Sequence, residues 1–285
     1  MADLSVMILC GQSPRHLYVA NRLCAGARPV AIVQEAGSQW TAGRIVRQLK
    51  PGNLWRKGWR WLRDRRRYMG GKEASFFFGE HPPRLVRQDL LVEVPHINHP
   101  DVVALADRLK PDVIAVFGTS LIRGPLLSKG RLGIFNLHGG LSPYYRGADC
   151  TFWALYNGEL DQIGCTLHRI DPGIDTGDLV AHVCPEVREN DDELTLFWRA
   201  VRDGADAYVE LLGRLARGER LGQPQSEKGR LYQVRQRGWG EERVLSARIR
   251  NGLLRESRLP RRVRWFFAGP SQKTSEATVS EGTAR

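Results

Sequence analysis

Short apolar runs alternate with helix-patterned segments along this chain, and that alternation limits the fold more than any other feature. Residues 4–10 (LSVMILC) form one such run, residues 15–27 carry apolar side chains at helical spacing, and residues 29–35 (PVAIVQE) form a second, β-branched run. A helix that connects two strands of one sheet leaves those strands parallel. The opening of the chain therefore predicts a β-α-β unit.

The same pattern returns beyond residue 100. Helical periodicity in DVVALADRLK ends at Pro111, and a buried-strand pattern follows in VIAVF. The elements expected here are a helix at 101–110, strands at 113–117, 132–138, 162–170 and 178–184, and a long helix at 191–217. Strands that alternate with helices favour an α/β fold, namely a Rossmann-like, doubly wound and mostly parallel sheet with helices on both faces. A short C-terminal extension follows this sheet.

Composition divides the chain further. The predicted core occupies residues 1–220 and holds a basic, Trp-rich insert at about 40–95. Residues 221–267 remain basic and contain a short helical pattern, so we expect a C-terminal extension there. Residues 268–285 are too polar and too poor in apolar side chains to fold, and we expect them to form a disordered tail.

The insert has an unusual charge pattern. Residues 44–72 contain eleven Lys or Arg and a single acid, Asp64. On a helical wheel from 53 to 69, one face holds Trp55, Trp59, Leu62 and Met69, and the opposite face holds Arg56, Lys57, Arg60, Arg63 and Arg67. Two interpretations remain open. Either this amphipathic helix lies on an anionic membrane surface, or its apolar face packs on the core and leaves the arginines in solvent.

Charge and hydropathy narrow the class of protein. The net charge of +12 makes an anionic partner an expectation, such as nucleic acid, a membrane surface or a phosphorylated small molecule. We found neither an apolar run of the roughly 18 residues that span a bilayer nor the basic start of a signal peptide, so we expect a cytoplasmic protein, with peripheral contact at the inner membrane face as a further hypothesis. The wide spacing of the five cysteines favours buried, reduced thiols over disulfides or a zinc site.

A candidate site lies where one predicted strand ends. Asn136 and His138 close the run LGIFNLH, and residues two apart on a strand point to the same face, so we expect the amide and the imidazole side by side. Ligands of doubly wound sheets bind at the carboxyl ends of the strands. The loop IDPGIDTGD after another predicted strand offers Asp171, Asp175 and Asp178, and a carboxylate near an imidazole orients it and raises its pKa.

These motifs carry a resemblance to a known family. FNLHGGLSPYYRG (135–147), followed by DPGIDTGDLV (171–180), resembles the formyltransferases that use 10-formyltetrahydrofolate, which include glycinamide ribonucleotide, methionyl-tRNA and amino-sugar enzymes. Their shared pattern is N-x-H at a strand end, a loop L-x-P-x-[YF]-x-G and an Asp in a Gly-rich loop. The resemblance covers roughly residues 4–218. Gly139-Gly140 stands where many relatives have Pro-Ser, which removes no catalytic side chain.

The resemblance implies which side chains do the chemistry. Asn136 would donate a hydrogen bond to an oxyanion, His138 would donate to it or shuttle protons, and Asp175 would position His138 or take a proton through water. The pterin of 10-formyltetrahydrofolate would be held largely by backbone groups of two loops, through Phe117, Gly118, Thr119, Leu121, Ile122, Asp171, Gly173 and Ile174. No metal is needed for this reaction.

Two segments are candidates for binding the acceptor. Gly11, Gln12 and Ser13 form the turn before the first helix, where a helix N-terminus favours a phosphate, although any such turn needs a glycine and a polar cap. Tyr144 and Arg146 either contact the substrate or belong to a loop that covers the site. The other histidines form no set with Asn136 and His138, so we expect surface or structural roles for His16, His81, His96, His99, His168 and His182.

The expected acceptor is an amino sugar, nucleotide-linked and used for cell-surface polysaccharide. A core followed by a segment like GRLYQVRQRG resembles the amino-sugar enzymes of the family. A lipid-linked sugar met at the membrane is a variant of this hypothesis. The alternatives are a methionyl-tRNA formyltransferase, a formyltetrahydrofolate hydrolase and a non-catalytic relative that binds RNA. A nucleic-acid partner is not the expectation, and a homodimer is a further hypothesis.

Overall fold

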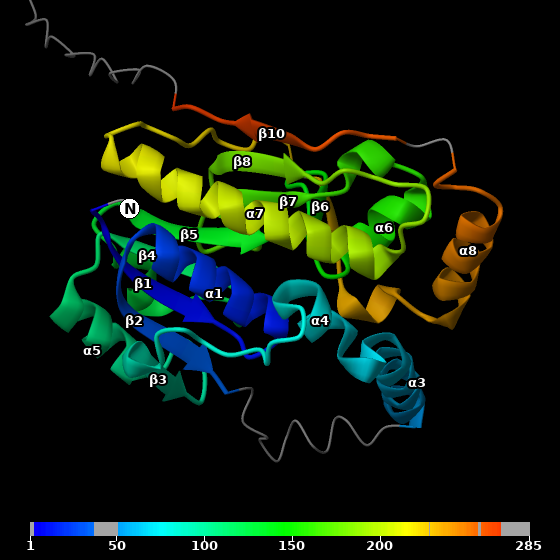
Figure 1. The fold of residues 1–285 in the computed structure, drawn as a ribbon, viewed down its shortest axis with the longest axis horizontal. Helices are drawn as coiled ribbons and strands as arrows, with labels where there is room; N and C mark the ends of the chain where they lie inside the picture. Colours follow the sequence, from blue (N-terminus) through cyan, green and yellow to red (C-terminus); the bar gives the residue numbers. More distant parts are fainter. Residues whose placement is uncertain (1–2, 37–50, 228, 256–257, 269–285) are drawn as a thin grey trace, which may run out of the picture.

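A computed structural model describes residues 3–36, 51–227, 229–255 and 258–268, with only the backbone for residues 51–57 and 66 (Figure 1). The first part of the insert and almost all of the predicted tail at 268–285 lie outside the described residues. The side chains of Trp55, Arg56 and Lys57 from the predicted wheel also lie outside them.

The described helices and strands alternate as the sequence predicts. In chain order they are β1 (Ser5–Cys10), α1 (Pro14–Gly26), β2 (Arg28–Glu35), α3 (Pro51–Tyr68), η1 (Met69–Gly71), α4 (Lys72–Phe78), η2 (Gln88–Leu90), β3 (Leu91–Val94), α5 (Pro100–Leu109), β4 (Val113–Phe117), η3 (Gly124–Ser128), β5 (Gly133–His138), β6 (Tyr145–Gly147), α6 (Cys150–Asn157), η4 (Leu160–Gln162), β7 (Cys165–Arg169), β8 (Leu179–Cys184), α7 (Glu193–Ala216), β9 (Arg230–Tyr232), η5 (Val234–Gln236), α8 (Trp239–Arg250) and β10 (Arg262–Trp265). The 3-10 turns are labelled η. Each helix and strand predicted before residue 220 is therefore confirmed to within a few residues.

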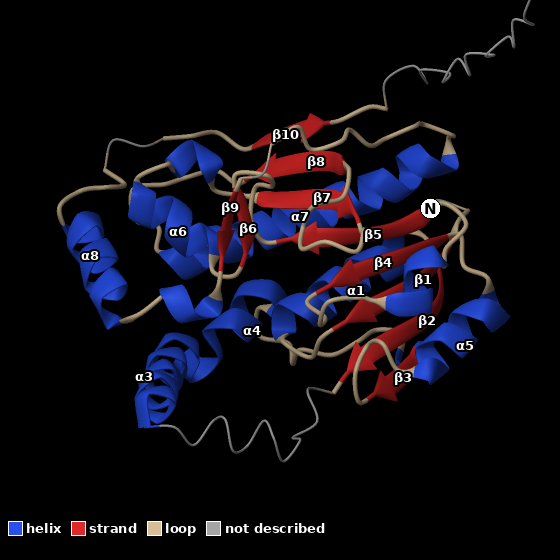
Figure 2. Ribbon diagram, turned by 180° about the vertical axis from the view of Figure 1, so that it is seen from behind, coloured by secondary structure: helices blue, strands red, loops and turns tan. Residues whose placement is uncertain are grey.

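The main sheet has the order β10-β8-β7-β5-β4-β1-β2-β3 within the described residues (Figure 2). From β5 to β3 all neighbouring strands are parallel, whereas β7, β8 and β10 continue the sheet as antiparallel strands. The prediction of a mostly parallel, Rossmann-like sheet is confirmed. For β7 and β8 the antiparallel pairing has a simple cause, because the loop 170–178 is too short for the crossover of about a dozen residues that parallel neighbours need.

Helices cover both faces of this sheet (Figure 1). The helices α1 and α7 pack together over one face, and α5 with the η3 turn covers the other. The strands β1 and β4 are buried along their whole length, since apolar side chains on both of their faces meet a helix layer. The two faces form separate buried clusters, which is the doubly wound arrangement.

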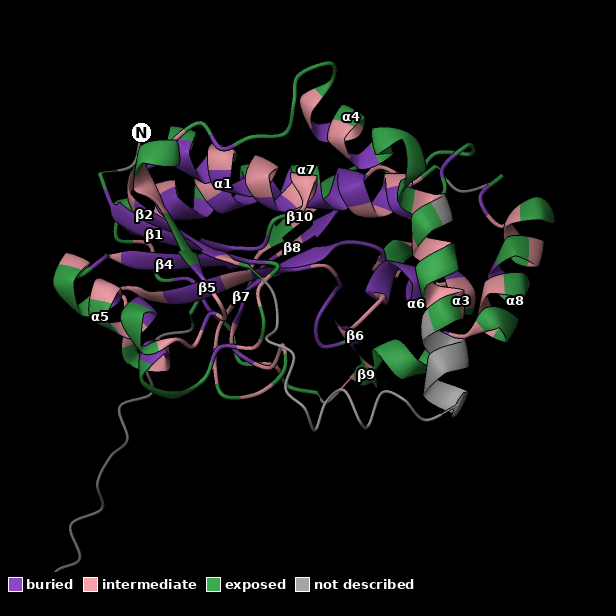
Figure 3. Cartoon of the chain, turned by 90° about the horizontal axis from the view of Figure 1, so that it is seen from below, coloured by how far each residue is buried: buried purple, intermediate pink, exposed green. Residues whose placement is uncertain are grey.

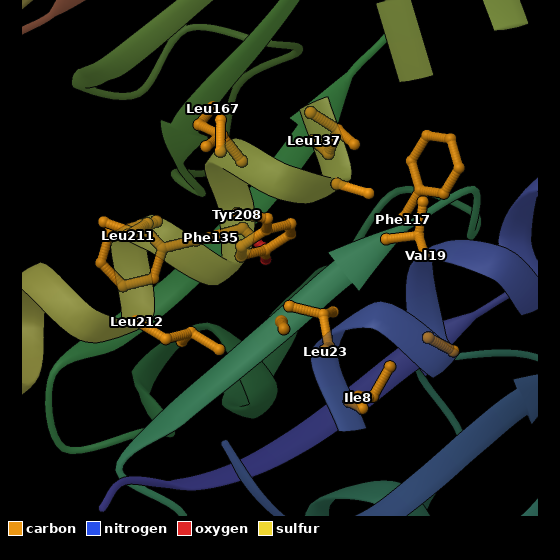
Figure 4. Close-up of a cluster of buried hydrophobic side chains, with 14 of the residues drawn as sticks. Ile8, Val19, Leu23, Phe117, Phe135, Leu137, Leu167, Tyr208, Leu211 and Leu212 are labelled. Atoms are coloured by element: carbon orange, nitrogen blue, oxygen red, sulfur yellow. The ribbon is translucent and has the colours of Figure 1, made fainter. Parts of the chain in front are cut away.

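Tyr208 on α7 ties the helix layer to the strands that lead to the candidate site (Figure 4). Its hydroxyl donates to the carbonyl of Phe135 at 2.6 Å and accepts from the N–H of Val116 at 2.9 Å. Because Tyr208 is fully buried, both bonds are shielded from water and fix α7 over β4 and β5. The strand that ends in Asn136 and His138 is thereby held in place.

The predicted C-terminal extension packs against the core in two places. β10 pairs with β8 at the edge of the main sheet, and β9 pairs in parallel with β6 to form a second, two-stranded sheet. The ring of Tyr232 on β9 stacks on Tyr145 and Trp153, with centroid distances of 5.6 and 4.7 Å. The sequence did not predict the β6–β9 sheet, because strands this short show no readable alternation. β3 lies within the range of the insert and still pairs with β2.

The described part of the chain offers no helix that combines the length and the apolar character needed to cross a bilayer. All five cysteines are buried, as predicted, and they are unpaired. Burial raises the pKa of the Cys10 thiol to about 12, so this side chain behaves as a small apolar group.

Candidate active site

Two adjoining cavities open at the carboxyl ends of β4 and β5. The larger one, called the active-site cavity below, has a volume of about 450 Å³, and the smaller one has about 150 Å³. Thr119, Asn136 and Asp175 line both. Two ligands, one in each cavity, would therefore contact each other at these three residues.

Asn136 is held by a histidine on the neighbouring strand. The antiparallel register of β5 and β7 places His168 directly opposite Asn136, and Nδ2 of Asn136 lies 3.1 Å from Nε2 of His168. Nδ1 of His168 lies 2.7 Å from the carbonyl oxygen of Arg169, and a carbonyl oxygen can only accept a hydrogen bond. Nδ1 of His168 therefore carries the proton, and Nε2 accepts the N–H of Asn136. The second N–H of this amide remains for a ligand.

The expectation that His168 forms no set with Asn136 and His138 is wrong. His168 is buried, and its Nε2 also lies 3.5 Å from Oδ1 of Asp175. Strand register brings the two histidines together, and the register depends on which strand pairs with β5. Local sequence spacing carries no signal for that choice.

His138 has both ring nitrogens close to acceptors. Nε2 lies 3.2 Å from the carbonyl oxygen of Tyr145, so it donates there, and Nδ1 lies 3.4 Å from Oδ2 of Asp175. Burial lowers the pKa of His138, and the Asp175 charge opposes that shift only in part. The imidazole is therefore neutral near pH 7, and Nδ1 can take up a proton beside Asp175. The Sγ of Cys150, 3.5 Å from Nε2, stays protonated because burial raises its pKa well above the usual value.

Asp175 is fixed in a strained loop. Its φ of 50° lies in the left-handed region, which Asp tolerates better than most residues. The N–H of Gly147 donates to its Oδ2 at 2.9 Å, and Nε2 of Gln225 donates to the carbonyls of Asp175 and Gly177 at 2.9 and 2.7 Å. Burial acts to raise the pKa of Asp175, but the charge that His138 carries once it is protonated and the Gly147 N–H outweigh it and hold this pKa below its usual range. The carboxylate is thus charged next to both imidazoles.

The residues predicted to hold the pterin lie around the two cavities. Thr119, Leu121, Ile122, Asp171 and Gly173 line the smaller one, and Phe117, Gly118, Thr119 and Ile174 line the active-site cavity. Asp171 shapes its own loop, since its Oδ1 accepts from Oγ1 of Thr176 at 2.7 Å and from the N–H of Gly173 at 3.1 Å. Their role in binding a pterin stays a prediction.

The predicted phosphate turn lies behind a histidine. Gly11, Gln12 and Ser13 are absent from the lining of both cavities among the described residues, and His16 reaches the active-site cavity in their place. A Cβ at Gly11 or Gly118 would overlap the His16 ring, so these two glycines make room for it. Phosphate binding at this turn stays a prediction.

Tyr144 and Arg146 also lie outside both linings. Tyr144 is exposed, whereas Arg146 is buried and donates to the carbonyls of Ile174 at 3.4 Å and Gly229 at 3.2 Å. Arg146 thus connects β6 with the loop that carries Asp175 and with the C-terminal segment. The interpretation that this loop covers the site gains support from these bonds.

A charged wall closes the active-site cavity on the side of α3, and sequence reasoning missed most of it. The wall consists of Arg15, Arg63, Asp64, Arg67, Asp149, Glu193 and Arg237. Arg237 is almost fully buried and bonds to Asp149 at 2.8 Å and to Glu193 at 2.8 and 2.9 Å. No local pattern marks Arg237, because two of its partners, Asp149 at the start of α6 and Glu193 in α7, lie far away in the sequence.

Figure 3 shows both exposed and half-buried residues along the described part of the basic helix α3. Two of its arginines turn toward the protein. The Arg63 and Arg67 side chains are only 12% and 19% exposed, whereas Trp61 is 61% and Met69 58% exposed. Arg67 pairs with Glu193 at 2.9 Å. For Arg63 and Arg67, the interpretation that the arginines of this helix face solvent is therefore wrong, whereas Arg65 is exposed. Acidic partners on α7 and α8 decide which face turns inward.

His16 makes a testable contribution to pH-dependent stability. Burial and the nearby Arg15 lower the pKa of His16 to about 3, against about 6.5 in an unfolded chain. Below pH 6.5 the unfolded chain binds a proton that the folded protein does not, so the free energy of unfolding falls as pH falls. Between pH 6.5 and 5.5 protonation of His16 in the unfolded chain lowers the free energy of unfolding of the wild-type protein by about 1 kcal/mol. We expect His16→Gln to lack this contribution, so that its free energy of unfolding falls by about 1 kcal/mol less over the same range. Urea unfolding at both pH values measures it, and an unchanged pH dependence would contradict the assignment.

The arrangement defines a class of protein. An amide, an imidazole with a paired carboxylate and two adjoining cavities are groups that suit an enzyme that moves an acyl-type group between two molecules. Residues 79–212 match the model of the formyl transferase family. The predicted resemblance to formyltransferases is thereby confirmed.

Curated relatives match about half of the chain. A methionyl-tRNA formyltransferase from Chlorobium chlorochromatii is 34% identical over 135 residues, which are 47% of this chain and 43% of the relative. One from Caldanaerobacter subterraneus is 30% identical over 158 residues, 54% of this chain and 51% of the relative. The chain thus spans about half the length of these relatives, and the likeness bears on the core.

Solved structures share the fold over most of the chain. A sugar N-formyltransferase from a Shewanella species matches with a TM-score of 0.54 and 15% identity, over 86% of this chain and 87% of the other. A 4-N formyltransferase from Francisella tularensis gives 0.53 and 11% over 87% and 88%, and a glycinamide ribonucleotide transformylase from Symbiobacterium toebii gives 0.51 and 20% over 79% and 92%.

Proposed function

We propose that this protein transfers the formyl group of 10-formyltetrahydrofolate to the amine of an amino sugar that is joined to a phosphate-bearing carrier. The sequence-based expectation for that carrier is a nucleotide. Asn136, His138 and Asp175 perform the transfer. The match of residues 79–212 to the formyl transferase family supports the formyl chemistry, and the charged cavity beside His138 supports the acceptor class.

The smaller cavity suits the flat ring of a folate. Leu121, Ile122 and Ile170 provide apolar walls, and Asp171 with nearby backbone groups provides hydrogen-bonding partners at its edge. When bound, 10-formyltetrahydrofolate supplies the formyl carbon, and its N10 is the leaving nitrogen. Asn136 and Asp175 lie at the junction of the cavities, which is where the formyl group would lie.

The site residues divide the chemistry between them. A bond forms between the acceptor nitrogen and the formyl carbon, and the bond from that carbon to N10 breaks. The free N–H of Asn136 stabilises the negative charge that develops on the formyl oxygen. His138 accepts the amine proton at Nδ1, beside the charge of Asp175, and N10 gains a proton as it leaves.

One observation carries the choice of a small acceptor. The active-site cavity is walled by α3 and by Arg237 from the C-terminal segment, and its volume of about 450 Å³ is that of a small-molecule site. Its guanidinium and carboxylate groups suit an acceptor with hydroxyls, an amine and a phosphate. A sugar on a phosphate-bearing carrier has this set of groups.

A folate-release assay tests the proposal. Purified protein is mixed with 10-formyltetrahydrofolate and a panel of nucleotide-linked amino sugars, initiator methionyl-tRNA or no acceptor, and tetrahydrofolate and product masses are followed. We expect a mass gain of one CO unit on an amino sugar. Release without any acceptor would instead indicate a hydrolase, and neither turnover nor folate binding would favour the non-catalytic relative.

Methionyl-tRNA is the second candidate acceptor. Both curated relatives named above are methionyl-tRNA formyltransferases, and the net charge of +12 suits a polyanion. A mass gain on methionyl-tRNA in the same panel, with none on the sugars, would establish this candidate.

We further propose peripheral contact with an anionic membrane through residues 53–69. In the described part of that range, Trp61 and Leu62 are exposed, and Arg65 lies over the Trp61 ring at 5.2 Å. Aromatic and basic side chains together favour an anionic bilayer surface. Co-sedimentation with phosphatidylglycerol vesicles at low salt is expected, and its absence would end this proposal. A homodimer stays a prediction.

A further inference from the structure

A third cavity, the α3–α8 groove, lies next to the active-site cavity. Trp59 and Leu62 of α3 and Trp239 and Ala247 of α8 provide its apolar lining, and its volume is about 940 Å³. Figures 1 and 3 show α3 and α8 side by side at one end of the molecule. Because no motif in the sequence assigns a role to α8, this groove is a feature of the tertiary structure alone.

Two arginines separate the groove from the active-site cavity. Arg63 and Arg67 line both spaces. Among the described residues, Nη1 of Arg63 is buried without a hydrogen-bond partner, since the Glu242 carboxylate lies 3.6 Å away. Buried guanidinium N–H groups normally bond, so this atom has unused capacity for an oxyanion.

The lining of the groove is positively charged overall. It holds four arginines and one acid, Glu242. Arg237, which lies outside the groove lining, already donates to Oε1 of Glu242 from Nε at 2.7 Å and pairs with it from Nη2 at 2.6 Å. At the rim, Arg243 and Arg250 form no ion pair within the described part of the chain. An occupant with negative charge next to the arginines complements this field.

The rest of the lining favours an aliphatic chain over a nucleotide base. Apart from the indole N–H groups, Ser246 is the one uncharged polar side chain among the described lining residues. Few groups are therefore present to form hydrogen bonds with the polar edge of a nucleotide base. Leu62 continues the apolar surface from the groove to the exposed Trp61 of α3 and Met69 of η1. An apolar chain could therefore enter from that side.

We propose that the α3–α8 groove binds the apolar chain of a lipid phosphate that carries the acceptor amine. Its phosphate lies against Arg63 and Arg67, and the amine reaches the active-site cavity. This inference rests on the proposed function and makes a lipid phosphate, in place of a nucleotide, the carrier of the sugar.

Calorimetric titration of the full chain tests the groove directly. The probes are geranyl phosphate, geraniol and UMP, and tetrahydrofolate is titrated separately. We expect geranyl phosphate to bind at least about tenfold more tightly than either geraniol, which lacks the charge, or UMP, which lacks the chain.

Matched variants locate the binding. Ala247→Trp fills the groove, and Arg243→Ala/Arg250→Ala removes its two rim charges; each is expected to weaken geranyl phosphate binding about tenfold. The control Arg108→Ala/Arg235→Ala removes two exposed cations outside the groove and is expected to change binding less than about twofold. Equal losses in the control would show that binding depends only on net charge and would overturn the assignment.

The remaining outcomes separate this inference from the proposed function. Tetrahydrofolate binding without geranyl phosphate binding overturns the lipid groove and leaves the formyltransferase proposal standing. Tighter binding of UMP than of geranyl phosphate also overturns it and restores the nucleotide carrier. No tetrahydrofolate binding at all contradicts the proposed function itself.

Discussion

We expect His138→Ala to lower kcat/KM for formyl transfer about a thousandfold, within the range of general acid–base catalysis. The substitution removes the one imidazole nitrogen, Nδ1, that can take the amine proton next to the charged Asp175, 3.4 Å away. Since Nε2 is already committed to the Tyr145 carbonyl, the ring has no second nitrogen for this task. Tetrahydrofolate release at limiting acceptor measures the effect.

Two comparisons make this result specific. His138→Ala/Asp175→Asn is expected to be no more than about threefold slower than His138→Ala, because residues that act as a unit are strongly non-additive. The control His96→Ala removes an imidazole outside both cavities and should keep wild-type activity. Comparable losses in His96→Ala, or near-normal rates in His138→Ala, would contradict the assigned role.

The second large effect concerns stability. We expect Arg237→Met to lower the free energy of unfolding by about 3–5 kcal/mol, the usual cost of removing one partner from a buried ion cluster. The Arg237 side chain is 1% exposed and pairs with Asp149, Glu193 and Glu242. Its loss would leave three carboxylates without their shared cation in the wall of the active-site cavity. Urea unfolding gives the free energy and the slope m.

A neighbouring arginine provides the control. Arg230 also comes from the C-terminal segment and pairs with Glu159 at 2.8 Å, but its side chain is 54% exposed. Solvent screening limits such pairs, so Arg230→Met should cost less than about 1 kcal/mol. If Arg237→Met cost no more than Arg230→Met, the cluster around Arg237 would not stabilise the fold as described.

The sequence determined the strands, the helices and the three side chains at the centre of the site. The apolar runs at β1, β4 and β5 and the helical spacing in α1 and α7 follow local periodicity, which depends only on neighbouring residues. Asn136 and His138 are two apart on one strand, so they point to the same face of the sheet whichever strands pair with it. Asp175 was found through the resemblance of its loop to a known family.

Tertiary structure alone decided which partners surround these groups. His168 joins Asn136 because β7 pairs with β5 in one register, and no local pattern fixes that register. Periodicity grouped the arginines of α3 on one face but did not say which way that face turns. Glu193 and Glu242, more than a hundred residues away in the sequence, pair with Arg63 and Arg67, and Trp61 stays in solvent. A guanidinium group that is withdrawn from water needs a carboxylate partner, and only the tertiary structure supplies these two.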